Sequence, residues 1–370
     1  MRMLFFLGHP AHYHLFKHVI RRFLDQGARV TVVIVKKDVL ETLVAGENWD
    51  VVNLAPEGRR MPGVPFLLAG PVLLWRTESR LFRLVRELRP AVMVGTERTL
   101  AHIGLLLGIP SVIFNEDDTG ATPENILFYP FATCLMLPGC CDAGKWTKRR
   151  ASYPSYHELA YLHPELFAPE PTIARGLASE DGGRYFLLRL VSLTASHDVG
   201  KRGIDNELAG ELIAFLSSRG RIHITAERPL PPQFEPYRIQ VDPRDMHHVL
   251  AGADLLVGDS QTMAAEAMVL GTPSVRINDF VGRLSYLQEL EDKWKLGVGL
   301  PMNAADRLLD TVRDLVDAPD GTAVLAGRRK AMLDARTNPV ETFCRVIALA
   351  AARRPLVEMR RAVETPAATS

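Results

Sequence analysis

The stretch LLVGDSQTMAAEAMVLGTPSV, residues 255–275, decides the fold class. It reads as a buried strand, a short polar turn and a helix, followed by Gly271 and Pro273 at the start of another strand. A helix that begins just beyond a parallel strand presents free backbone N–H groups and the positive end of its dipole. We therefore expect a diphosphate to bind at this turn, which is formed by Asp259, Ser260, Gln261, Thr262 and Met263.

Glu266 lies in the same predicted helix, within two turns of its start. From there a carboxylate can accept hydrogen bonds from both hydroxyls of a ribose whose diphosphate lies on Ser260 and Thr262. The alternative is an ordinary capped helix with a solvated glutamate, because Ser and Asp are common capping residues.

Strands and helices alternate along both halves of the chain. The first half predicts strands at 3–7, 29–35, 51–54, 91–95 and 111–114, and a helix at 14–26. The second half predicts strands at 185–191, 221–225, 237–241, 254–258 and 273–277, and helices at 206–217 and 261–270. Strand, helix and strand at this spacing predict two successive parallel sheets of α/β type.

The length of 370 residues is suited to two domains. We expect a first domain at 1–165 and a second at 166–360, joined through the irregular segment 145–182. Residues 338–361 read as one long helix that could pack back on the first domain, and 362–370 as a disordered tail.

The composition excludes several classes of protein. Apolar residues make up 47% and charged residues 24%, and the net charge of +1 gives no overall attraction for nucleic acid. His9 and Pro10 interrupt the first apolar run before a signal-peptide core can form, which predicts a cytoplasmic protein. The four cysteines lack zinc-type spacing, so we expect reduced structural thiols. We also expect no metal site and no cofactor.

The first predicted strand ends in GHPAHYH, where Gly8 permits a close backbone turn. Ligands of open parallel sheets bind beyond the carboxyl ends of the strands, so His12 and His14 lie where a substrate is expected. Either imidazole is a candidate general base. Structural histidines and a metal site are the alternatives.

Acidic residues follow the next two strands of the first half. Glu97 comes after the fourth strand, and Glu116, Asp117, Asp118 and Glu124 come after the fifth. Carboxylates gathered at one edge raise one another's pKa, which suits acid–base catalysis, whereas solvated loop acids are the alternative. In the second half, the loop 192–205 carries His197, Lys201 and Arg202, which could contact a phosphate or sugar, or belong to a surface loop.

The segment 64–76, VPFLLAGPVLLWR, is apolar but too short to span a bilayer. Arg59, Arg60, Arg80 and Arg83 flank it, and this pattern is typical of docking on an anionic membrane surface. A core helix with a basic outer face is the alternative.

Four stretches together resemble the family known as domain of unknown function 354: GHPAHYHLFKHVI, GTERTLAHIGLLLGIPSVIFNEDD, YHELAYLHP and GDSQTMAAEAMVLGTPSVRIND. This resemblance, which covers residues 1–294, implies a GT-B-like fold in which two Rossmann-like domains face a central cleft. The order of motifs is also similar to the non-hydrolysing UDP-N-acetylglucosamine 2-epimerases. That similarity implies catalytic roles for Glu97, where those enzymes have Asp, and for Glu116, Glu124 and His197. The loop around His197 lacks their arginine-rich run, and the histidine-bearing first turn is similar to that of inverting glycosyltransferases.

Three functions follow from these patterns. The first is a metal-independent glycosyltransferase of surface polysaccharide or glycolipid assembly, which uses a nucleotide sugar, UDP-linked by resemblance, and a lipid-linked or saccharide acceptor. The second is a sugar-nucleotide 2-epimerase, and the third is a non-catalytic sugar-nucleotide binding protein on an enzyme fold. The sequence predicts peripheral contact with the inner face of the plasma membrane and no nucleic-acid partner.

Overall fold

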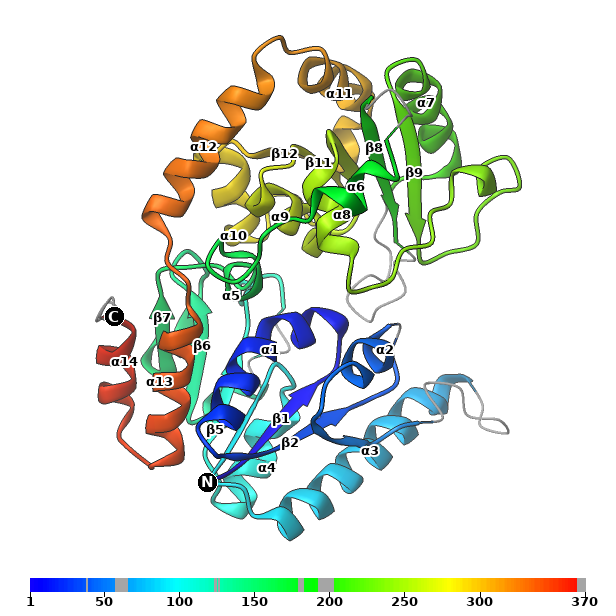
Figure 1. Ribbon diagram of the computed structural model, residues 1–370. Coiled ribbons are helices and arrows are strands. Elements are labelled where there is room, and N and C mark those ends of the chain that lie inside the picture. Colours follow the sequence, from blue (N-terminus) through cyan, green and yellow to red (C-terminus); the bar gives the residue numbers. More distant parts are fainter. Residues whose placement is uncertain are drawn as a thin grey trace. The chain divides into compact units, whose positions relative to one another are not determined.

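The computed structural model describes residues 1–37, 39–56, 66–122, 125, 127–178, 183–191 and 203–364, and for residues 66–74 it describes the backbone alone. The chain folds into two compact units (Figure 1). The first unit comprises Met1–Tyr161 and Asn338–Ser370, and the second comprises Leu162–Thr337. The C-terminal segment thus belongs to the first unit.

The first unit contains a sheet of seven parallel strands in the order β3-β2-β1-β4-β5-β6-β7. Its strands are β1 (Arg2–Leu7), β2 (Arg29–Ile34), β3 (Asp50–Asn53), β4 (Val92–Gly95), β5 (Ser111–Phe114), β6 (Cys134–Pro138) and β7 (Arg150–Tyr153). In the central register Phe5 lies between Val32 and Val94, and all three are fully buried. Burial on both faces explains why these strands are continuous apolar runs.

The strand order reverses between β1 and β4, because β2 and β3 extend the sheet to one side and β4 to β7 to the other. Right-handed crossovers therefore place α1 (Pro10–Asp25) and α2 (Leu40–Ala45) on one face, and α3 (Phe66–Leu88) and α4 (Thr99–Leu107) on the other. The carboxyl ends of β1 and β4 thus form a topological switch point, which is the usual place for a ligand in such sheets.

The C-terminal segment completes the core of the first unit. Phe343, on α13 (Val340–Ala351), makes edge contacts with Phe114 and Tyr153 at 4.8 Å between ring centroids. The following helix α14 (Leu356–Glu364) packs on β7, where Arg360 donates a hydrogen bond to the carbonyl of Arg150. These contacts explain why the C-terminal segment belongs to the first unit.

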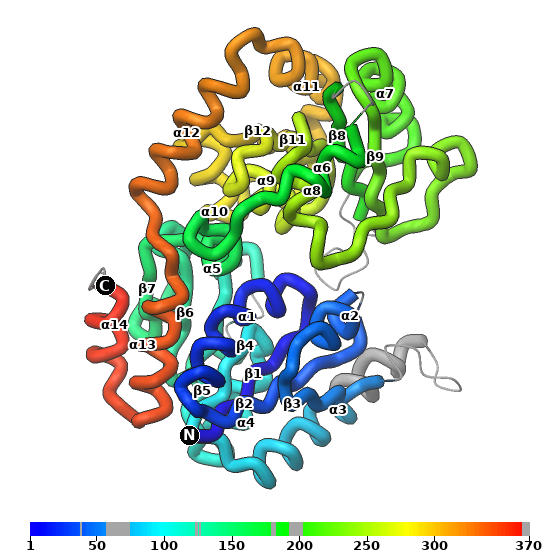
Figure 2. The backbone as a smooth tube through the Cα atoms, viewed as in Figure 1, coloured from blue at the N-terminus to red at the C-terminus, as the bar shows by residue number. Residues whose placement is uncertain are grey.

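The second unit contains a sheet of five parallel strands in the order β12-β11-β10-β8-β9. Figure 2 traces the backbone of this unit, with β8, β9, β11 and β12 labelled. Its strands are β8 (Tyr185–Leu190), β9 (Arg221–Ala226), β10 (Leu255–Gly258), β11 (Ser274–Ile277) and β12 (Gly297–Leu300). Here the order reverses between β8 and β10. The α-helices of this unit are α6 (Pro171–Arg175), α7 (Asn206–Ser217), α8 (Met246–Gly252), α9 (Gln261–Leu270), α10 (Ser285–Gln288), α11 (Leu308–Val316) and α12 (Gly321–Ala335).

Shorter helical segments connect these elements. They are η2 (Tyr129–Phe131), η3 (Gly144–Arg149), η5 (Glu235–Tyr237), the π-helical turn η6 (Glu289–Lys293) and η7 (Met302–Arg307). The short helix α5 (Leu159–Leu162) contains the boundary between the two units.

Three details differ from the sequence predictions. Residues 237–241 form no strand, because Pro236 and the turn η5 precede them and only Arg238 bridges to Ile224 at the edge of the sheet. The predicted helix 338–361 is two helices, because Arg353 has φ 55° and Pro355 cannot continue the first one. Strands β6, β7 and β12 were not predicted.

Candidate active site

Gly8 and Glu97 meet at the switch point of the first unit. Gly8 directly follows β1, and Glu97 lies just beyond β4. A Cβ atom at Gly8 would lie 2.1 Å from Oε1 of Glu97, well inside van der Waals contact. The absence of a side chain at Gly8 therefore lets the glutamate pack against the backbone.

His9 starts the helix that follows. It is the N-cap residue of α1, its Nδ1 accepts a hydrogen bond from the backbone N–H of Ala11 at 3.1 Å, and Pro10 takes the first helical position. An N-cap and a proline at this position both favour helix initiation. The contacts of His9 are thus those of a capping residue.

His12 faces the switch point from the first turn of α1. Its Nδ1 accepts a hydrogen bond from the backbone N–H of Gly8 at 3.1 Å, and its Nε2 lies 2.9 Å from Oγ1 of Thr96. Burial, followed by the positive charges of His9, Lys37 and His157, lowers the pKa of His12 well below 6.5. A neutral imidazole that accepts at Nδ1 carries its proton on Nε2, so His12 is a hydrogen-bond donor in this arrangement.

His14 points elsewhere, because residues two apart on a helix lie on roughly opposite sides. It is buried, and its ring packs 5.1 Å from Tyr13 and 5.3 Å from Tyr161. The structure therefore brings His12, and not His14, to Gly8 and Thr96.

Glu116 lies beyond the end of β5, and its Oε2 is 3.1 Å from Nδ1 of His157. His157 follows β7 and is 7% exposed, with its ring stacked on Tyr153. Its Nε2 is buried and has no hydrogen-bond partner among the described residues. A ligand hydroxyl could supply this bond, and the Oε2 of Glu116 and the Nε2 of His18 are likewise buried without a hydrogen-bond partner among the described residues.

The two acids after Glu116 differ in their surroundings. Asp118 is buried, and its Oδ1 accepts a hydrogen bond from the backbone N–H of Asp142 at 2.6 Å. Asp117 is only partly exposed, and burial, together with the charge of Glu116, raises the pKa of Asp117 to about 7. Asp117 therefore exchanges a proton near neutral pH.

The turn between β10 and α9 lies at the switch point of the second unit. Ser260 is the N-cap of α9, and its hydroxyl accepts a hydrogen bond from the backbone N–H of Met263 at 3.3 Å. Gln261 and Thr262 are half-buried in the first turn, whereas the side chain of Met263 is buried. The turn thus has the form that the sequence predicted.

Asp259 belongs to the framework of this turn. It is 3% exposed, and its carboxylate accepts hydrogen bonds from the backbone N–H groups of Val191 at 2.8 Å and Ile204 at 3.3 Å. Burial raises the pKa of Asp259 to about 6. Its backbone carbonyl accepts a hydrogen bond at 2.9 Å from the side chain of Asn278, which is fully buried.

Glu266 faces the interior of the second unit. Its Oε1 lies 3.0 Å from Nε2 of His247, on α8, and only 6% of the Glu266 side chain is exposed. This contact links α8 to α9, and the binding of a ribose by Glu266 stays a prediction. Four predicted site residues, namely Glu124, His197, Lys201 and Arg202, lie outside the described residues.

The sequence assigned no role to Thr96, His157 or His247. His157 was quoted within the stretch YHELAYLHP, but no spacing rule connects it to Glu116, which lies two strands earlier in the chain. Contacts of this kind depend on the order of strands in the sheet. Across the described ranges, no group of three or more His, Cys, Asp or Glu side chains could hold a metal ion.

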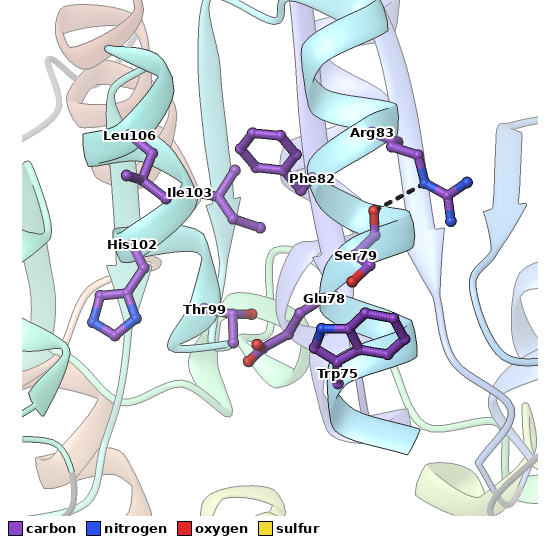
Figure 3. Close-up of a pocket in the computed structure, with 9 residues that line it drawn as sticks. All are labelled: Trp75, Glu78, Ser79, Phe82, Arg83, Thr99, His102, Ile103 and Leu106. Atoms are coloured by element: carbon purple, nitrogen blue, oxygen red, sulfur yellow. Dashed lines mark hydrogen bonds between the residues drawn. The ribbon is translucent and has the colours of Figure 1, made fainter. Parts of the chain in front are cut away.

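A separate apolar groove of about 500 Å³ lies between α3 and α4 in the first unit (Figure 3). Phe82 and Ile103 meet between the two helices, and Trp75 and Leu106 lie at the surface, 69% and 73% exposed. Leu105, Leu127 and Phe131 are also exposed, and His102 joins them to the groove through its contacts with Phe131 and the carbonyl of Leu127. We call Trp75, Leu105, Leu106, Leu127 and Phe131 the apolar surface.

The apolar surface is wider than the sequence suggested, because α4 and the segment 127–131 contribute to it. The predicted segment 64–76 is described only in part: residues 64 and 65 lie outside the described residues, as do Arg59 and Arg60, and the side chains of 66–74 are not described. No helix among the described residues is both long and apolar enough to cross a membrane.

Solved structures with a similar fold cover nearly the whole chain. The UDP-N-acetylglucosamine 2-epimerase of Neisseria meningitidis, bound to UDP-N-acetylglucosamine, is 10% identical with a TM-score of 0.62, over 96% of this chain and 100% of the epimerase. Os79 of O. sativa, in complex with U2F and a trichothecene, is 16% identical with a TM-score of 0.63, over 95% and 100%. MurG of Acinetobacter baumannii is 15% identical with a TM-score of 0.56, over 94% and 99%.

The chain matches no protein-family model and no curated protein sequence, so the resemblance to domain of unknown function 354 stays a prediction. The structural likeness confirms the predicted fold class. The protein has the GT-B fold of glycosyltransferases and UDP-N-acetylglucosamine 2-epimerases, with two α/β units that each contain a parallel sheet.

Proposed function

We propose that the protein is a glycosyltransferase that takes its sugar from a nucleoside diphosphate sugar, with UDP as the nucleotide. The observation that carries this proposal is the capped turn between β10 and α9, which lies at the switch point of the second sheet. A diphosphate there receives hydrogen bonds from backbone N–H groups and the positive end of a helix dipole. Similar structures that contain UDP or UDP-N-acetylglucosamine support the choice of nucleotide.

In this reaction an acceptor hydroxyl attacks the anomeric carbon and the nucleoside diphosphate leaves. Negative charge grows on the leaving diphosphate, and N–H groups that already point at it stabilise the transition state without reorganisation. No metal ion is needed for this role. In the first unit, His12 and the hydroxyl of Thr96 form a hydrogen-bonded pair at the switch point, where the acceptor is proposed to bind.

A 2-epimerase is the second candidate. It is supported by the carboxylates of Glu97, Glu116 and Asp117, which follow the two adjacent strands β4 and β5, because such an enzyme removes and returns a proton at the second carbon of the sugar. Its other predicted residues, Glu124 and His197, lie outside the described residues.

Proton NMR of UDP-N-acetylglucosamine in heavy water, with the protein and no acceptor, separates the two activities. Under our proposal the nucleotide binds saturably and the proton at the second carbon of the sugar stays. Deuterium at that carbon, with a second sugar nucleotide appearing, would establish the epimerase. No binding of UDP or any UDP-sugar would overturn both.

We also propose that the apolar surface contacts an anionic membrane, where a lipid-linked acceptor is found. Trp is favoured at the boundary between lipid and water, and exposed leucines can enter the outer acyl region. Arg83 and Arg86 of α3 are exposed close by in the same helix and complement anionic headgroups. A membrane-bound acceptor would assign the activity to surface polysaccharide or glycolipid assembly.

A further inference from the structure

Four groups at the switch point of the first unit could in principle accept a proton from a substrate. They are His12, Glu97, Glu116 and Asp117. The contacts of the first three commit them to other roles. His12 uses Nδ1 to accept the N–H of Gly8, and the carboxylate of Glu97 packs against the backbone of Gly8.

Glu116 is held by His157, whose Nδ1 lies 3.1 Å from its carboxylate. Next in sequence, Asp118 is held by the backbone N–H of Asp142. Asp117 lies between them, and in the described part of the chain its carboxylate receives no hydrogen bond. Its backbone is nevertheless fixed, because the side chain of Asn115 donates a hydrogen bond to its carbonyl at 3.0 Å.

We propose that Asp117 is the catalytic base, which removes the proton from the acceptor hydroxyl; this assignment rests on the proposed glycosyltransferase activity. The carboxylate of Asp117 takes the proton while the acceptor oxygen forms a bond to the anomeric carbon. The bond from that carbon to the diphosphate breaks, and its electron pair leaves with the diphosphate. Atoms and charges balance without any further reactant.

The charges around Asp117 fit this task. Glu116 and Asp118 of its own loop raise its pKa, whereas Arg98, beyond β4, and His157, beyond β7, lower it. Tyr129 of η2 also faces it, as an uncharged phenol. Burial outweighs the two cations and raises the pKa of Asp117 to about 7. A base with a pKa close to the working pH transfers protons most efficiently.

His157, which pairs with Glu116, has a ring nitrogen that a ligand could contact. His157 is 7% exposed, and its Nε2 has no hydrogen-bond partner among the described residues. A sugar or acceptor hydroxyl at this position would complete the hydrogen bonding of His157.

Asp117→Asn tests the assignment, with Asp142→Asn as the matched control. Asp142 lies in the adjacent turn, where its side chain accepts a hydrogen bond from the N–H of Gly144, and an asparagine oxygen can do the same. We expect D117N to bind UDP within about twofold of the wild type and to lose about 10²- to 10⁴-fold in turnover. D142N should retain both properties. A D117N variant that turns over at the wild-type rate would overturn the assignment.

A titration of the wild-type protein, labelled with ¹³C at the aspartate carboxyl carbons, gives a readout that needs no activity. The Asp117 resonance is assigned as the one that is missing from the spectrum of D117N, or of Asp117→Ser if D117N does not fold. In the wild type this resonance should titrate near pH 7. Its midpoint should fall in Glu116→Gln and rise in His157→Gln, since these variants remove an anion and a cation. A midpoint near pH 4 in all of them would overturn the assignment. Failure of the wild type to bind any UDP-sugar would overturn the proposed function as well, whatever the titration shows.

Discussion

The backbone N–H of Gly8 donates a hydrogen bond to Nδ1 of His12 across 3.1 Å. Since this bond needs a lone pair on Nδ1, protonation of His12 at that nitrogen would break it. The pKa of His12 is lowered well below its unfolded value of 6.5, chiefly by burial. The folded state therefore disfavours the imidazolium.

This lowered pKa predicts a loss of stability in acid. The unfolded chain takes up a proton at His12 below pH 6.5 and the folded chain does not, so the free energy of unfolding should fall as the pH drops from 6.5 towards the folded pKa. In His12→Gln this contribution is absent, while the amide oxygen can still accept the Gly8 N–H. Denaturant unfolding at several pH values from 7.5 to 5 should give a shallower decline for H12Q. Parallel curves would contradict the lowered pKa.

Gly8→Ala tests the close approach of Glu97. The added Cβ would lie 2.1 Å from Oε1 of Glu97, so the glutamate side chain must move. We expect a loss of about 1–3 kcal/mol in unfolding free energy, together with a large loss of turnover. Gly120→Ala is the control, because nothing lies within 4 Å of its Cβ position. Equal unfolding free energies of the two variants would show that the Glu97 side chain moves aside without destabilising the fold.

Ser260 combines two roles that can be separated. Ser260→Asp keeps an N-cap oxygen for α9 but places a negative charge where the diphosphate is proposed to bind. The variant should keep its stability within about 0.5 kcal/mol and lose UDP affinity by about tenfold or more in calorimetry. Asp205→Ser, at the N-cap of α7, makes the reverse exchange at a different helix and should alter neither property. Wild-type UDP affinity in S260D would exclude the diphosphate from this turn.

Much of this fold could be predicted because it depends on local patterns. Helices α7 and α9 begin and end where the sequence predicts, since Asp205 and Ser260 cap them and Gly271 ends the second. Strand β12 was not predicted from the sequence because it contains two glycines and lacks an apolar run. The segment is a strand because it pairs with β11. Gly299 allows Glu291 to pack closely on this strand, since a Cβ atom at Gly299 would lie 2.4 Å from the Glu291 carboxylate.

The site was less predictable than the fold, because its contacts join residues that are distant in sequence. The sequence places Glu116 at the end of a strand, but not that His157 would lie beside it. It predicts Glu266 in the right helix, yet the carboxylate lies against His247, nineteen residues earlier in the chain. In α9 the residues from Met263 to the end of the helix are all buried, so this helix has no exposed side. The periodicity of apolar residues therefore could not indicate in which direction Glu266 points.

The ion pair of Arg276 and Glu291 is predicted to be essential for the stability of the second unit. The guanidinium donates two hydrogen bonds to the carboxylate, at 2.9 and 3.1 Å, and both residues are buried. Glu291→Leu leaves a buried cation without its counter-charge, which should cost about 3–5 kcal/mol in unfolding free energy. The double variant R276M/E291L should recover much of this loss. Asp242→Asn, in the exposed pair with Arg244, should cost less than about 1 kcal/mol.

Replacing Trp75 and Leu106 by serine tests the membrane contact of the apolar surface. Both side chains are largely exposed, and their transfer into lipid should supply about 1.5–3 kcal/mol each. The double variant W75S/L106S should therefore bind vesicles of phosphatidylcholine and phosphatidylserine at least tenfold more weakly in cosedimentation. The matched control is Val357→Ser on α14, which is 51% exposed and should bind as the wild type does.

Binding of the wild type should weaken with salt, because exposed arginines act on the anionic headgroups. If the wild type binds no vesicles and W75S/L106S instead abolishes self-association in sedimentation analysis, the apolar surface is covered by a second copy of the chain and the membrane proposal is wrong.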